Sequence, residues 1–201
     1  MTEPSAKPTI VRKVVVIFDV CSSTAILEDL LRTENHVAWQ SVLGHLKRFF
    51  WSHGIGKSQM YKFLGDGWIL LFDDQEISGS SLISLLNELS TEYDRLFRKY
   101  VETVLSNMPD NIGLTFGVDE GSLVKIVMNK QKEYVGRAIN VAARLQAATK
   151  KIDGPTAGTL LISTNAYARL KLPVKGKLVV CDLANVAGGT RYRARMVRLA
   201  K

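Results

Sequence analysis

The stretch Lys13-Val-Val-Val-Ile-Phe18-Asp19-Val-Cys-Ser-Ser-Thr24 joins an apolar run to an aspartate and several small, hydroxyl-bearing residues. An apolar, mostly β-branched run of this length is typical of a buried strand. The residues after the aspartate lead into a helical segment, so their backbone N–H groups are available to an anion. We therefore expect a carboxylate at the end of a buried strand, beside an anion-binding loop. An aspartate that only caps a helix or turn has the same local pattern.

Two hairpins are expected further along the chain. The first joins strands at 59–64 and 68–72 through Gly65-Asp66-Gly67. The second joins two strands within 111–128 through a turn at Asp119-Glu120-Gly121. Aspartate followed by glycine is a common tight-turn pair, which gives the first turn a local physical basis.

Apolar residues recur at helical spacing in three longer segments, which are residues 34–53, residues 80–105 and the segment around residue 140. Shorter elements complete the chain, with strands near 159–162, 177–182 and 190–197 and a helix near 164–170. Strands and helices are mixed along the whole length. This order predicts an α+β fold with a mainly antiparallel sheet flanked by helices.

The chain carries a net charge of +8, from 27 Lys and Arg residues against 19 Asp and Glu residues. A positive field of this kind steers polyanions, which include both nucleic acids and nucleoside triphosphates. The sequence has neither the aromatic-basic motif of an RNA-binding sheet nor zinc-ligand spacing. We therefore expect no nucleic-acid partner.

No apolar run approaches the ~20 residues that a helix needs to cross a bilayer, and the first residues lack the apolar stretch of a signal peptide. The two cysteines, Cys21 and Cys181, match no disulfide or metal spacing. We expect a cytoplasmic protein with no membrane partner. Its residues 1–11 are expected to form a flexible arm, and residues 12–201 a single domain.

Asn140 and Arg144 lie four residues apart in Gly136-Arg-Ala-Ile-Asn140-Val-Ala-Ala-Arg144-Leu145. On a helix this spacing places both side chains on one face. An amide can orient a sugar, and a planar guanidinium can hold charge that builds up on a phosphate. Asp19 and Asp66, each at a strand end, could share metal ions ~3.5–4 Å apart that clamp the two oxygens of an in-line displacement. As a simpler alternative, Asp66 only forms a tight turn.

Taken together, these segments resemble the main signatures of class III nucleotidyl cyclases. The resemblance rests on Phe18–Thr24, Lys62–Gly67 and Gly136–Leu145, with Ile112–Gly121 similar to the family's second hairpin. It covers roughly residues 13–197. It implies a ferredoxin-like, palm-like core in which a ribose 3′-hydroxyl attacks the α-phosphate of its own nucleoside triphosphate. The products would be a 3′,5′-cyclic nucleotide and pyrophosphate.

The resemblance also implies a role for each matching residue. Asp19, Asp66 and the backbone of Val20 would bind two Mg²⁺ or Mn²⁺ ions, while Asn140 orients the ribose and Arg144 stabilises the transferring phosphate. The residues expected to bind phosphate are Ser22, Ser23, Thr24, Lys175 and Lys177. In this family one chain supplies the aspartates and its partner supplies the base reader, the Asn and the Arg. A homodimer with two shared sites is therefore expected.

Lys62 matches the family's base-reading lysine, and Glu133 stands at the second base-reading position, seven residues before Asn140. One donor and one acceptor satisfy adenine, cytosine, uracil or guanine, so hydrogen-bond counting does not choose the base. A pyrimidine is smaller than a purine, so its polar edge lies closer to the sugar. A glutamate, which is one methylene longer than an aspartate, could reach that edge. The bare catalytic domain also resembles the pyrimidine cyclases of bacterial antiphage (Pycsar) systems. We favour a cyclase that makes cUMP or cCMP over a stand-alone adenylate cyclase, and both over a nucleotide-binding module that has lost catalysis.

Overall fold

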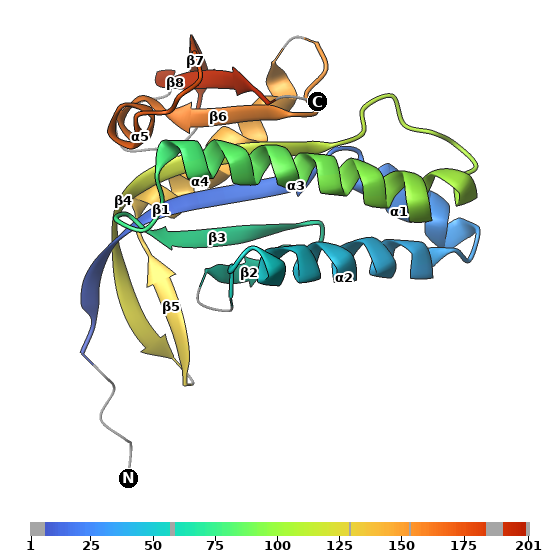
Figure 1. The fold of residues 1–201 in the computed structure, drawn as a ribbon, viewed down its shortest axis with the longest axis horizontal. Coiled ribbons are helices and arrows are strands. Elements are labelled where there is room, and N and C mark those ends of the chain that lie inside the picture. The colour runs from blue at the N-terminus through green and yellow to red at the C-terminus, as the bar shows by residue number, and fades with distance from the viewer. Residues whose placement is uncertain (1–6, 57–58, 129, 153, 184–190, 200–201) are drawn as a thin grey trace.

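The strand quoted first is longer than its apolar run, because β1 extends from Thr9 to Val20. A computed structural model describes residues 7–56, 59–128, 130–152, 154–183 and 191–199 (Figure 1). The pairing of β1 with β4 (Leu114–Met128) begins at Thr9. Residues 9–11 therefore belong to the sheet and not to the flexible arm that we expected over residues 1–11, of which residues 1–6 lie outside the described residues.

The described strands form one eight-stranded sheet, with β1 and β4 near its centre. Its order is β2-β3-β1-β4-β6-β8-β7, and β5 pairs with β4 outside this path. The remaining strands are β2 (Met60–Phe63), β3 (Gly67–Asp73), β5 (Gln131–Val135), β6 (Thr159–Ser163), β7 (Lys177–Asp182) and β8 (Arg191–Arg198). Within the described sheet, only the pairing of β4 with β6 is parallel. The mainly antiparallel α+β fold is thus confirmed.

Helices cover both faces of this sheet, as Figure 1 shows. The first three are α1 (Ser23–Arg32), α2 (His36–Ser52) and α3 (Gly79–Tyr100), and the last two are α4 (Arg137–Ala148) and α5 (Thr164–Leu170). Short 3-10 turns follow α3 at Glu102–Val104 and α4 at Thr149–Lys151. In the part of the chain that the structure describes, none of the helices has the length and apolar character needed to span a bilayer.

Side chains of β1 alternate between two hydrophobic cores. Val14, Val16 and Phe18 pack against α1, α2 and α3, whereas Val15 and Ile17 pack with side chains of α4. Successive strand residues point to opposite faces of a sheet. The same alternation therefore places the next odd-numbered residue, Asp19, on the face that α4 covers.

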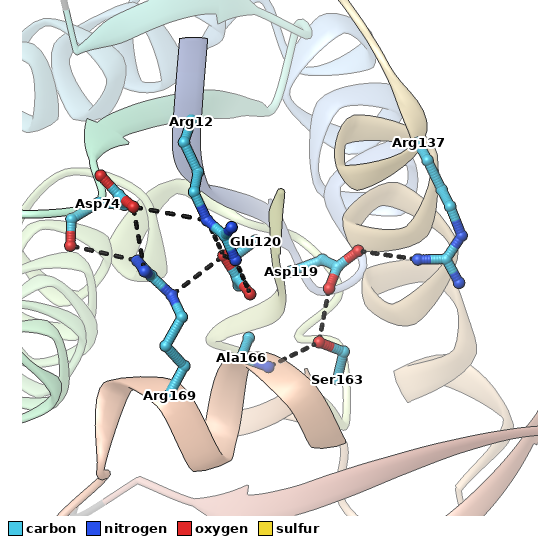
Figure 2. A network of polar contacts seen from close by, with 8 residues as sticks. All are labelled: Arg12, Asp74, Asp119, Glu120, Arg137, Ser163, Ala166 and Arg169. Atoms are coloured by element: carbon cyan, nitrogen blue, oxygen red, sulfur yellow. Dashed lines mark hydrogen bonds and ion pairs between the residues drawn. The ribbon is translucent and has the colours of Figure 1, made fainter. Parts of the chain in front are cut away.

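The expected turn at Asp119-Glu120-Gly121 is wrong. These residues lie inside β4, which runs without a break from Leu114 to Met128. The hairpin is formed instead by β4 and β5, and β5 was not predicted. Alternation within β4 sends the two carboxylates to opposite faces, where each one finds partners from distant parts of the chain (Figure 2).

Ion pairs explain why the strand continues through these residues. Glu120 contacts Arg12 of β1 and Arg169 of α5 at 3.0 Å each, and Figure 2 shows it between the two guanidinium groups. On the other face Asp119 accepts a 2.5 Å hydrogen bond from Ser163. An Asp-Glu-Gly sequence has a tendency to form a turn, and that tendency depends only on local residues. These long-range contacts outweigh it.

Candidate functional site

Strand register brings the two predicted metal-binding aspartates together. Asp19 of β1 pairs directly with Gly67 of β3, so Asp66 lies one residue from Asp19's partner. A Cβ atom at Gly67 would lie 1.9 Å from the carbonyl oxygen of Phe18, so no larger residue fits at this crossing. The turn itself uses a positive φ of 101° at Gly65. The glycine-bracketed sequence thus forms the expected hairpin and places Asp66 beside Asp19.

The environment of Asp19 is poorly suited to a bare carboxylate. Burial raises its pKa above the usual aspartate range, and the neighbouring carboxyl of Asp66 raises it further, while Lys150 lowers it. The side chain of Asp66 accepts a short hydrogen bond from the hydroxyl of Ser23. Two carboxylates this close repel each other, so a cation between them would relieve the repulsion.

Two residues that the sequence analysis did not identify contact Asp19. The Nζ atom of Lys150 lies 2.9 Å from Asp19 Oδ2. The Gln146 side chain donates to Asp19 Oδ2 at 3.3 Å and to the hydroxyl of Thr115 at 2.9 Å. Lys150 stood in an expected loop, and Gln146 looked like an ordinary helix residue, so nothing local marked either one. Only the packing of α4 on the sheet brings them to Asp19.

Helix α4 lies unusually close to the sheet because β4 carries a glycine beneath it. A Cβ atom at Gly117 would lie 2.1 Å from the carbonyl oxygen of Ala142 and 2.4 Å from the backbone nitrogen of Gln146. This close packing fixes which side of α4 faces the sheet. The buried residues of α4 are Ala138, Val141, Ala142, Leu145, Gln146 and Ala148.

Asn140 and Arg144 lie on the other side of α4. A residue advances about 100° around a helix, so Arg144 points roughly 160° away from Gln146. Asn140 is exposed and Arg144 is half-buried. Among the described residues, neither side chain has a hydrogen-bond or ion-pair partner. The predicted common face is present, but a single chain does not bring this pair to Asp19.

The two residues predicted to read the base, Lys62 and Glu133, contact each other. Lys62 Nζ lies 3.1 Å from Glu133 Oε2, and Tyr61 donates a short hydrogen bond to the same oxygen. The Tyr61 hydroxyl in turn accepts a 3.1 Å hydrogen bond from the backbone N–H of Tyr134. The contacts of Tyr61 and Lys62 lower the pKa of Glu133, which keeps it an ionised acceptor. Tyr61 is a member of this group that the sequence analysis missed.

The loop after Asp19 holds the three predicted phosphate-binding hydroxyls. Ser22 has a left-handed φ of 57° at the start of α1 and donates to the carbonyl of Asn111 at 2.9 Å. Ser23 is engaged with Asp66, and Thr24 is exposed in the first turn of α1. Val20, the last residue of β1, pairs with Leu114. These residues all lie next to Asp19, and the hydroxyls of Ser22 and Ser23 are both engaged in hydrogen bonds within the chain.

The two other predicted phosphate ligands lie elsewhere. Lys177 begins the edge strand β7, and the exposed Lys175 precedes it. Three strands separate β7 from β1 in the sheet order, a distance of about 19 Å at ~4.8 Å per strand. Within one chain, neither lysine is brought to the carboxylates.

Asp19 and Asp66 have the chemistry of a divalent-cation site. They supply hard oxygen ligands beside the loop that follows Asp19. The ammonium of Lys150 already contacts the Asp19 carboxylate as a cation would. In the described part of the chain, no cluster of three or more His, Cys, Asp or Glu side chains forms a complete metal site. Further ligands would have to come from backbone, water or a bound phosphate.

Solved structures of nucleotide cyclases share this fold. A bacterial light-regulated adenylyl cyclase matches with a TM-score of 0.69 at 19% identity, over 98% of this chain and 55% of that one. The guanylyl cyclase Cya2 matches with a TM-score of 0.70 at 16% identity, over 98% and 96% of the two chains. The adenylyl cyclase CyaB from P. aeruginosa matches with a TM-score of 0.66 at 17% identity, over 98% and 100%.

The chain therefore spans about half the length of the light-regulated cyclase and nearly the full length of the other two structures. The similarity confirms the expected palm-like cyclase fold. Neither a protein-family model nor a curated protein matches the sequence.

Proposed function

We propose that this protein is a nucleotidyl cyclase, which converts a nucleoside triphosphate to a 3′,5′-cyclic nucleotide and pyrophosphate. The observation that carries the proposal is the separation of two half-sites within one chain. Asp19 and Asp66 form a carboxylate pair under α4. Asn140 and Arg144 form a polar pair on the far side of α4, with no partners among the described residues. Each half is incomplete alone, and together they supply what the cyclisation needs.

In the proposed reaction, the bond from the ribose O3′ to the α-phosphorus forms and the bond from that phosphorus to the pyrophosphate oxygen breaks. The 3′-hydroxyl proton passes to solvent water, and pyrophosphate leaves. The Asn140 amide orients the ribose, and the planar Arg144 guanidinium neutralises charge on the transferring phosphate. When bound at Asp19, Asp66 and the Val20 backbone, two Mg²⁺ or Mn²⁺ ions would supply Lewis-acid stabilisation to the reacting oxygens.

The two half-sites require a second copy of the chain, so we propose a homodimer with two shared sites. A head-to-tail pair would place α4 of one protomer against the carboxylates of the other. The hairpin of β4 and β5 projects from the sheet in Figure 1, so a second chain could contact it. Its exposed apolar side chains include Val124, Val127, Met128 and Val135. Exposed apolar residues grouped on one projection are typical of an interaction surface.

For the base, we propose that Lys62 and Glu133 act together as one donor and one acceptor. Their ion pair and the contact with Tyr61 hold both groups in place before a nucleotide arrives. We favour a pyrimidine, UTP or CTP. The polar edge of a pyrimidine lies closer to the sugar than that of a purine, and glutamate, which is one methylene longer than aspartate, could reach it. ATP is the alternative substrate. A role in bacterial antiphage signalling rests on the sequence resemblance and goes with the pyrimidine substrate.

The decisive experiment incubates the purified protein separately with ATP, GTP, CTP and UTP in the presence of Mn²⁺ and identifies the products by mass. We expect a cyclic nucleotide and pyrophosphate in equal amounts, and no product from Asp66→Asn. Asp182→Asn, an exposed aspartate at the end of β7, is the matched control and should retain activity. Absence of any cyclic product would overturn the cyclase proposal, and cyclic AMP as the main product would overturn the pyrimidine preference.

A further inference from the structure

Lys150 is bonded to the carboxylate that the proposed function assigns to metal binding. Its Nζ atom lies 2.9 Å from Asp19 Oδ2, and the side chains of Lys150 and Asp19 are 60% and 16% exposed. The pair thus joins a nearly buried anion to a cation that remains in contact with solvent. The hydrogen bond to Asp19 raises the pKa of Lys150, and the negative charges of Asp19 and Asp66 raise it further.

The backbone beneath Lys150 is fixed, although its side chain is long. Lys150 lies in the 3-10 turn after α4, next to the fully buried Thr149. The hydroxyl of Thr149 donates to the carbonyl of Gln146 at 2.6 Å, and Gln146 is itself held by Thr115. The flexible four-carbon side chain of Lys150 is therefore attached to a backbone that is held in place. The ammonium can leave Asp19 without any change in the fold.

A metal ion at Asp19 and the ammonium of Lys150 would compete for the same carboxylate, whose Oδ2 atom Lys150 contacts. Two cations held by one carboxylate repel each other at short distance. Resting on the proposed function, we propose that Lys150 is an internal counter-ion that a divalent cation displaces from Asp19, after which its ammonium binds the triphosphate of the metal-bound nucleotide. The two other lysines predicted for that task, Lys175 and Lys177, lie near the far edge of the same sheet.

Mn²⁺ binding without nucleotide tests the displacement directly. Free Mn²⁺ is measured by electron paramagnetic resonance during titration of the wild type, Lys150→Met and Lys151→Met. Methionine keeps a flexible unbranched stem of nearly the same length and removes the charge, and Lys151 is an exposed neighbour in the same turn. We expect Lys150→Met to bind Mn²⁺ about three- to tenfold more tightly than the wild type, the range that a single partly solvent-exposed ion pair implies. Lys151→Met should stay within about twofold, because solvent screens its charge.

Thermal unfolding supplies a second measurement that needs no activity. In EDTA, Lys150→Met leaves Asp19 without its counter-ion, so it should melt at a lower temperature than the wild type. Mn²⁺ should raise the melting temperature of Lys150→Met more than that of the wild type. Lys150→Arg keeps a cation at this position, and we expect it to resemble the wild type in both measurements. This variant also shows whether the turn tolerates substitution.

Inorganic triphosphate is the probe for the second half of the proposal. At saturating Mn²⁺, Lys150→Met should bind it about three- to tenfold more weakly than the wild type, while Lys151→Met should not differ. If Mn²⁺ binds the wild type and Lys150→Met equally, or if triphosphate binding is unchanged, the role of Lys150 is overturned and the metal site stands. If neither protein binds Mn²⁺ better than Asp19→Asn does, the metal site and the proposed function fail together.

Discussion

Arg144 and Gln146 stand two residues apart on α4 and point to opposite sides of it. The Gln146 amide lies 3.3 Å from Asp19 Oδ2 beneath the helix. Arg144 is half-buried on the other side and has no partner among the described residues. A helix can present only one of these side chains to the carboxylates of its own chain. The geometry of α4 thus separates a group that holds the acidic site from one that would act on a neighbouring molecule.

Mixing two inactive variants tests the shared site. Asp66→Ala removes one half-site and Arg144→Ala removes the other, so their heterodimer keeps one intact site of two. Random exchange makes half of the dimers mixed, and we expect roughly a quarter of wild-type activity. Cyclic product is measured before and after exchange, with native mass spectrometry to count heterodimers. Asp19→Ala mixed with Asp66→Ala is the control, because both changes affect the same half. Heterodimers without activity would contradict shared sites.

Gly117→Ala tests the close approach of α4 to the sheet. The added methyl would lie 2.1 Å from the Ala142 carbonyl oxygen, so α4 must move away from Asp19. We expect the free energy of unfolding to fall by about 1–3 kcal/mol, and the activity to fall with it. Gly44→Ala is the matched control, because Gly44 is exposed in α2 and its new Cβ would meet nothing within 4 Å. That change should stabilise the protein by up to about 1 kcal/mol. Equal unfolding midpoints in urea would contradict the packing argument.

Glu133→Gln tests the proposed role of Glu133 in base selection. The ionised carboxylate only accepts hydrogen bonds, whereas an amide also donates one, so the change alters which base edge fits. We expect the ratio of kcat/KM between the best and second-best nucleoside triphosphate to change about tenfold or more. Tyr61→Phe removes the hydrogen bond that holds Glu133 and should change the same ratio less. Glu102→Gln, at an exposed position after α3, should leave it unaltered. Unchanged ratios in Glu133→Gln would remove Glu133 from base selection.

Asp119→Asn tests a buried carboxyl by its pH dependence. Burial raises the pKa of Asp119 above its ordinary value of 3.8, although Ser163 and Arg137 oppose the shift. The native state therefore binds this proton more tightly than the unfolded state does. Stability that Asp119 contributes is present below the unfolded pKa and is lost as the pH rises through the folded pKa.

The measurement is urea unfolding of the wild type and Asp119→Asn between about pH 4 and about pH 7. As the pH rises, the difference in unfolding free energy should move in favour of the asparagine variant and then level off. Asp182→Asn controls for loss of a surface carboxylate. A difference that stays constant over this range would show that the Asp119 environment does not affect its ionisation.

Local sequence signals predicted those features of the site that are each determined by a single short segment of the chain. Asp19 at the end of an apolar run and Asp66 between two glycines were both correctly placed at strand ends. Four-residue spacing likewise predicted the common face of Asn140 and Arg144. That spacing could not show which way this face points. The direction depends on Gly117, a residue of another element that lets α4 approach.

Long-range contacts account for what the sequence did not show. The Asp119-Glu120-Gly121 segment contains residue types that are common in turns, yet Arg12 and Arg169 hold Glu120 within a continuous strand. Lys150 belonged to an expected loop, where a lysine has no distinguishing feature. Its contact with Asp19 joins residues that are 131 positions apart, and it exists only after the sheet and α4 have packed.

The alternation along β1 has a consequence for how this sequence can change over evolution. Phe18 and Asp19 are neighbours in the chain, but one belongs to a hydrophobic core and the other to the acidic site. Exchange of one β-branched residue for another upstream keeps this order. An insertion or deletion of a single residue would turn Asp19 into the core and Phe18 onto the charged face. Sequences that keep this chemistry can therefore diverge in composition along β1. The number of residues in the strand before Asp19 must stay constant, because it decides which face of the sheet each side chain points to.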